Sequence, residues 1–62
     1  MKKYYFTFGF GQLHEGCYTI IEAESFERAR EIMFEKFGNK WAFQYDSEDK
    51  AGVKEWNLKL IN

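Results

Sequence analysis

Residues 38–45, with the sequence GNKWAFQY, constrain the fold more than any other stretch of the chain. Gly38 follows a segment with helical spacing, and a glycine in this place commonly takes the left-handed conformation that ends a helix. Trp41, Phe43 and Tyr45 then alternate with smaller or polar residues, which is the period of a β-strand with one buried face. This stretch therefore predicts a helix end, a strand start and the heaviest part of the core.

The chain is short, and its size limits what can stabilise it. Its 62 residues predict one domain over residues 1–62, and so small a domain is commonly stabilised by a disulfide, a metal or a partner chain. The single cysteine excludes an internal disulfide, and His14 and Cys17 are too few ligands for a structural zinc site. We expect aromatic residues, 21% of the chain, to compensate for the small size of the core, because each buries a large area. Self-association is the other means of stabilisation that we consider.

The charges are balanced and interspersed along the chain. Nine Lys and Arg residues stand against ten Asp and Glu residues, for a net charge of −1, which argues against binding along a phosphate backbone. No apolar run reaches the length of a transmembrane helix, and polar residues interrupt any signal-peptide core after Met1. A free cysteine fits a reducing compartment. We therefore expect a cytoplasmic protein with no membrane contact.

Hydrophobic periodicity predicts four strands and one helix in the order β-β-α-β-β. The strands are expected at 3–10, 17–23, 41–46 and 53–61, and the helix at 26–37. Ser25 is a suitable N-cap for that helix. Glycine-bounded residues 11–16 are expected as a hairpin loop and the acidic residues 46–52 as a polar loop.

Two hairpins joined by a helix make an α+β fold: a four-stranded, mainly antiparallel sheet with one helix packed on one face. The other face of the sheet is then expected to be open. On the second strand, we place Cys17, Thr19, Ile21 and Ala23 inward. The expected core consists of Phe6, Phe8, Ile21, Phe26, Met33, Phe37, Trp41, Phe43, Trp56 and Leu58.

No pattern in the sequence predicts catalysis, a cofactor or a metal. The glycines around Phe10 are followed by a strand, whereas a phosphate-binding loop needs a helix N-terminus. His14 and Cys17 have no third group to orient them as a catalytic pair. The carboxylates of residues 46–52 lack the alternating spacing of a calcium loop. We therefore expect no enzyme activity, no cofactor and no metal site.

Two surfaces are candidates for binding a partner. The first is the open sheet face, which we expect to carry Tyr5, Tyr18 and Ile20. The second is a helix edge with Arg30 beside Phe34, because arginine and aromatic residues are enriched at binding hot spots. Contact with a protein, including a second copy of the chain, fits both surfaces. The alternative is stacking of nucleic-acid bases on the sheet tyrosines, against which the charge balance argues.

Two stretches carry a resemblance: residues 8–18 (FGFGQLHEGCY) and 34–45 (FEKFGNKWAFQY). They look like those of a group of small uncharacterised proteins encoded by phages and prophages of low-GC Gram-positive bacteria. The resemblance covers about residues 4–60 and implies a genomic context rather than an activity. By analogy of size and origin, it suggests a non-enzymatic inhibitor of a bacterial defence protein, as anti-CRISPR proteins are. The expected partner is then a host or phage protein in the bacterial cytoplasm.

Overall fold

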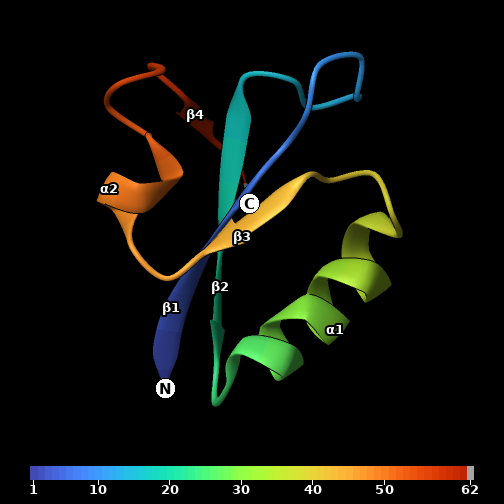
Figure 1. The fold of residues 1–62 in the computed structure, drawn as a ribbon. Coiled ribbons are helices and arrows are strands. Elements are labelled where there is room, and N and C mark those ends of the chain that lie inside the picture. Colours follow the sequence, from blue (N-terminus) through green and yellow to red (C-terminus); the bar gives the residue numbers. More distant parts are fainter. Residues whose placement is uncertain (62) are drawn as a thin grey trace.

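The computed structural model describes residues 1–61, which form one mixed sheet and two helices. The elements are β1 (Lys2–Thr7), β2 (Cys17–Ala23), α1 (Phe26–Phe37), β3 (Phe43–Tyr45), α2 (Glu48–Ala51) and β4 (Lys59–Leu60) (Figure 1). The strand order is β3-β1-β2-β4. The central strand β1 is antiparallel to β2 and β3, and β4 is parallel to β2.

This arrangement confirms the α+β class and the four-stranded, mainly antiparallel sheet with a helix packed on it. The expected second hairpin is wrong, because β3 and β4 lie at opposite edges of the sheet instead of pairing with each other.

The hairpin of β1 and β2 forms as the sequence predicts. Alternation in β1 buries Tyr4 and Phe6, and Phe8 remains buried just beyond the strand. In β2, Thr19, Ile21 and Ala23 are buried, and Cys17 is half-buried against the same core. The predicted inward faces of these two strands are therefore confirmed.

Beyond Phe8, the chain leaves the sheet and turns. The N–H of Gln12 donates to the carbonyl of Gly9 at 3.2 Å, and the side chain of Phe10 is 96% exposed. The expected strand therefore ends earlier than residue 10.

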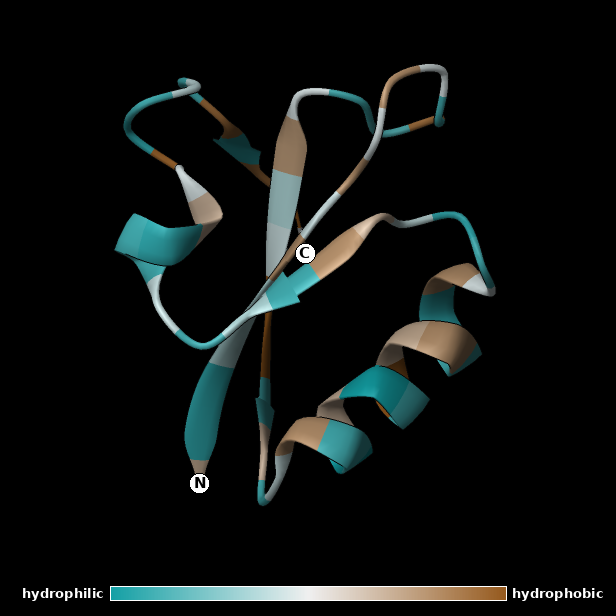
Figure 2. Ribbon diagram, in the orientation of Figure 1, coloured by the Kyte–Doolittle hydropathy of each residue, from teal (hydrophilic) through white to brown (hydrophobic). Residues whose placement is uncertain are grey.

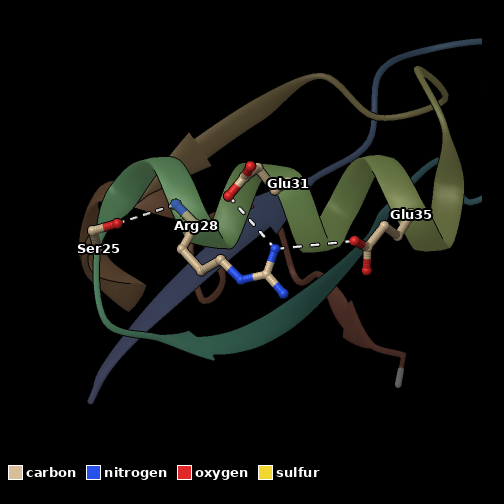
Figure 3. Close-up of polar contacts among 4 residues, drawn as sticks. All are labelled: Ser25, Arg28, Glu31 and Glu35. Atoms are coloured by element: carbon tan, nitrogen blue, oxygen red, sulfur yellow. Dashed lines mark hydrogen bonds and ion pairs between the residues drawn. The ribbon is translucent and has the colours of Figure 1, made fainter.

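Helix α1 begins where the sequence predicts. The Oγ atom of Ser25 accepts the backbone N–H of Arg28 at 3.1 Å, which satisfies one of the free donors of the first turn (Figure 3). On the outer side of the helix, the Arg28 guanidinium lies 3.5 Å from a Glu31 carboxylate oxygen and 4.0 Å from one of Glu35. These pairs are exposed, so each contributes little to stability.

Helix α1 ends at Gly38 with a positive φ, as predicted, but the expected left-handed conformation is wrong because ψ lies far from that region. Gly38 has φ 63° and ψ −128°, and its N–H donates to the carbonyl of Phe34 at 2.9 Å. The N–H of Lys40 donates to the carbonyl of Phe37 at 3.1 Å, which closes a four-residue turn. These angles are close to those of the first central residue of a type II′ turn, a position dominated by glycine. A single glycine therefore ends the helix and turns the chain toward β3.

The face of β3 is opposite to the one expected. Thr7 is the register partner of Phe43, yet its carbonyl accepts the N–H of Ala42 at 2.8 Å, so two successive residues face Thr7, as in a β-bulge. The bulge shifts the alternation by one residue. Trp41 therefore packs on the α1 side, whereas Phe43 and Tyr45 lie on the other side of the sheet.

The side chain of Gln44 confirms this orientation. It points toward α1, and its Nε2 donates to the carbonyl of Phe26 at 2.9 Å. The expectation that Phe43 belongs to the core against α1 is therefore wrong, and its side chain is 63% exposed.

The segment between β3 and β4 is more helical than expected. Ser47 caps α2 by accepting the N–H of Lys50 at 3.1 Å, and Gly52 ends it in the left-handed conformation. The chain continues in turns, with the N–H of Trp56 donating to Gly52 and Asn57 at φ 52°. The expected strand over 53–61 is therefore reduced to the two residues of β4.

These turns leave Trp56 71% exposed, so its place in the predicted core is wrong. The helices cover different faces of the sheet, α1 one face and α2 the other (Figure 1). Ala51 and Val53 are buried on the α2 side. The sheet face expected to be open is thus partly covered, by a helix whose own residues are mostly hydrophilic (Figure 2).

The core lies between the sheet and α1. It contains Tyr4, Phe6, Phe8, Ile21, Ala23, Ala29 and Met33. Of the other residues expected in it, Phe37 and Trp41 are half-buried against this cluster, and Leu58 is half-buried elsewhere. Phe26, in the first turn of α1, is 44% exposed, and its ring meets that of Tyr4 at 89° with centroids 5.8 Å apart. No helix within residues 1–61 is long and apolar enough to cross a membrane.

We predict that Gly38→Ala lowers the free energy of unfolding by roughly 1–3 kcal/mol, because a Cβ atom is strained at this positive φ. Urea denaturation followed by circular dichroism measures the change. Gly9→Ala is the control: Gly9 has no positive φ, and a Cβ there would make ordinary contacts, the nearest at 3.5 Å. Equal stabilities for the two variants would contradict the role of Gly38.

Candidate functional site

An arginine and two aromatic rings come together between α1 and β3. The guanidinium carbon of Arg30 lies 5.5 Å from the centroid of the Trp41 ring, within the range of a cation–π interaction. The ring of Phe34 meets the same indole edge-on, with centroids 5.5 Å apart. The two helix residues predicted as a contact edge are therefore adjacent, and Trp41 joins them.

The position of Trp41 is determined by its other contacts. Its Nε1 donates to the carbonyl of Gly38 at 3.1 Å. Its ring meets Phe6 at 5.1 Å in an edge-to-face arrangement, and Phe6 is completely buried. The indole thus has one side in the core and another available to solvent, because the bulge before β3 directs it toward α1.

These residues line a shallow depression that we call the α1–β3 groove, with a volume of approximately 380 Å³. Its walls include Phe26, Arg30, Phe34, Trp41, Phe43 and Gln44. Two phenyl rings are substantially exposed there, at 44% for Phe26 and 48% for Phe34, and the 63% exposed ring of Phe43 lies at the neighbouring sheet edge, on its α2 side. So much exposed aromatic surface in one place on a small protein is typical of a contact site.

Two polar side chains of the groove, Arg30 and Gln44, differ in how they are bonded. Among residues 1–61, Arg30 forms no ion pair, in contrast to Arg28 on the outer side of the helix. Its charge is therefore available to a carboxylate from outside. The Oε1 atom of Gln44 is buried and has no hydrogen-bond partner in this part of the chain, although its Nε2 atom is bonded to Phe26.

The second predicted surface is less open than expected. Tyr5 and Tyr18 lie side by side on the α2 face of the sheet with their rings stacked, 6.5 Å between centroids and 28° between planes. Tyr5, Tyr18 and Ile20 are all only half-exposed. The structure therefore brings the two tyrosines together, but each ring covers part of the surface of the other.

A second hollow, which the sequence reasoning missed, lies where α2 covers the sheet incompletely. We call it the α2 cleft; its volume is approximately 380 Å³. Thr7, Phe43, Tyr45, Ala51 and Trp56 line it, with Glu15 as its only charged residue. The indole of Trp56 lies over Gly52, where a Cβ atom would come within 2.5 Å of it. The expected strand at 53–61 obscured this site, because it placed Trp56 in the core.

His14 and Cys17, the residues considered for catalysis or metal binding, line neither the α1–β3 groove nor the α2 cleft. The His14 ring packs between Phe8 and Phe37, at 5.2 and 5.5 Å between centroids. The sulfur of Cys17 lies 3.9 Å from the carbonyl oxygen of Glu15. Within residues 1–61, no group of three or more His, Cys, Asp or Glu side chains is placed to hold a metal ion.

Comparisons with family models, curated proteins and solved structures found no match to this chain. A functional inference therefore depends on the surfaces of the molecule.

We predict that the two tryptophans contribute unequally to stability. Trp41→Ala removes an indole packed on Phe6 and is expected to cost about 3 kcal/mol, enough to leave little folded protein in a domain this small. Trp56→Ala removes a largely exposed ring and should cost less than about 1 kcal/mol. Urea unfolding of both variants measures the difference, and equal losses would show that Trp41 is not a core contact.

Proposed function

We propose that this protein is a non-enzymatic protein-binding module that contacts its partner through the α1–β3 groove. The observation that supports the proposal is the cluster of Arg30, Phe34 and Trp41. Arginine and tryptophan are among the residues most enriched at the energetic centres of protein interfaces. Here they lie together, solvent-accessible, in a groove that also contains the exposed ring of Phe26.

The groove is suited to binding because its walls are held in place before a partner arrives. Helix α1 is capped at Ser25 and ended at Gly38, and Trp41 is bonded to the carbonyl of Gly38. Little conformational entropy remains to be lost there on association. The free charge of Arg30 favours a partner that presents an aspartate or glutamate beside an apolar side chain.

The more specific form of the proposal is an inhibitor of a host defence protein, similar in mode to anti-CRISPR proteins. Its support is the resemblance to small phage and prophage proteins, together with a surface suited to adhesion. Such an inhibitor acts by covering a functional surface of its target, so it requires no catalytic group. The target is then a protein of the bacterial cytoplasm.

We predict that Arg30→Glu abolishes capture of a partner from a lysate of a low-GC Gram-positive bacterium by the immobilised protein. Reversing the charge places a carboxylate where the partner's acidic group binds and removes the cation from Trp41. Mass spectrometry compares the proteins retained by the variant and by the unmodified chain.

Arg28→Glu is the matched control. It makes the same charge reversal on the same helix, but on the side that carries the exposed pairs with Glu31 and Glu35. The proposal requires that a protein retained by the unmodified chain and by Arg28→Glu is lost with Arg30→Glu. A partner retained equally by all three would place the contact outside the groove.

Nucleic-acid binding, the alternative to protein binding, leads to a separate prediction. With a net charge of −1 and a stacked pair of half-exposed tyrosines, the chain should show no appreciable affinity for random single or double strands at physiological salt. Fluorescence anisotropy with labelled oligonucleotides across a salt series measures it. Tight binding that weakens steeply as salt rises would favour the nucleic-acid alternative.

A further inference from the structure

The hydrogen bonds of the sheet show which backbone groups face its free β3 edge. The carbonyl of Tyr18 accepts the N–H of Ile61, so the backbone of Tyr18 is turned toward β4 and away from β1. Its partner across the hairpin is Thr7. Since bonded and non-bonded pairs alternate in antiparallel ladders, the backbone of Thr7 is turned toward β3. The bond from Ala42 to the Thr7 carbonyl agrees with this.

The same alternation determines the direction of each residue in β3. Tyr5 and Thr7 face β3, and their partners are Tyr45 and Phe43. The backbone N–H and C=O groups of Tyr45 and Phe43 therefore point toward β1. The N–H and C=O of Gln44, between them, point outward from the sheet. Strand β3 lies at the edge of the sheet, and no strand within residues 1–61 pairs with its outer side.

Strand β3 has two of the usual protections of a sheet edge, a short length and the bulge at its start, but it lacks two others. Natural edges are commonly blocked by a charged side chain or a proline, and the strand Phe43–Tyr45 contains neither. Phe43 is instead a largely exposed ring, and it lines both the α1–β3 groove and the α2 cleft. The edge is therefore flanked by the α1–β3 groove on one side and by the α2 cleft on the other.

The strand is complementary to a second copy of itself. A two-fold axis beside Gln44 lets the two Gln44 residues exchange both backbone hydrogen bonds, the closed pair of an antiparallel ladder. Phe43 of each copy then lies opposite Tyr45 of the other. Aromatic pairs across strands stabilise a sheet, and Phe43 and Tyr45 are already neighbours within one chain, at 6.3 Å between ring centroids. No charged residue lies within the paired segment.

We propose that two copies of this chain associate through β3, antiparallel and centred on Gln44, to form one continuous eight-stranded sheet. The Phe43 and Tyr45 rings of both copies form a row on the α2 face, next to Trp56. The three-residue length of the edge makes the association reversible and concentration-dependent. The dimer does not rest on the proposed function, because it requires only a second copy, although Phe43 belongs to both surfaces.

Sedimentation equilibrium from roughly 10 μM to 1 mM tests the association, since a short interface is expected to have its dissociation constant in this range. The average mass should rise from that of the monomer toward twice that value. Hydrogen exchange by NMR over the same range tests the register. Exchange at the Gln44 amide should slow as the protein is concentrated, because only in the dimer is this N–H bonded.

Phe43→Lys places a charge on the edge and should lower the association constant at least about tenfold. Leu13→Lys is the control, because it also replaces an exposed apolar side chain by lysine, but in the turn between β1 and β2. Circular dichroism verifies that both variants fold. A monomeric mass over the whole range would overturn the proposal. So would a dimer whose Gln44 amide exchanges as in the monomer, or equal association of Phe43→Lys and the unmodified chain.

Discussion

The bond from the Ala42 N–H to the Thr7 carbonyl determines how the two sides of this molecule differ. It places two successive residues opposite one, so Trp41 turns toward α1 while Phe43 turns toward α2. With regular pairing, the aromatic residues of this segment would all lie on one face and compete for space against α1. With the bulge, the indole of Trp41 packs on Phe6 at the edge of the core and forms a wall of the groove. The phenyl ring of Phe43 is left at the sheet edge.

The parts of the fold that follow from local physical chemistry could be predicted from the sequence. Ser25 caps a helix through its own hydroxyl, and Gly38 ends that helix through its own backbone freedom. Alternation in β1 and β2 is likewise local, since each residue's neighbours determine its face. The bulge could not be predicted in this way, because it depends on pairing with Thr7, a residue distant in the sequence. The reversed face of β3 is a direct result.

Helix α2 had recognisable signals that the alternation of later residues concealed. Ser47 precedes two acidic residues, and Gly52 follows at the distance of a C-cap. The apolar residues of 53–61 alternate as in a strand, but the left-handed Gly52 and the positive φ of Asn57 turn the chain instead. At the candidate site, helical spacing was sufficient to bring Arg30 and Phe34 together. The contribution of Trp41 to that surface depends on tertiary structure, and only the folded chain reveals it.

The contrasting surroundings of Trp41 and Trp56 give the molecule two different optical reporters. One indole is half-buried, bonded through Nε1 and lies beside a guanidinium; the other is largely in water. Because indole emission depends on solvent contact, the two should emit at different wavelengths. Occupation of the α1–β3 groove would alter the emission of Trp41, and events on the α2 face that of Trp56. The chain can therefore report which of its two sides has been engaged without any attached label.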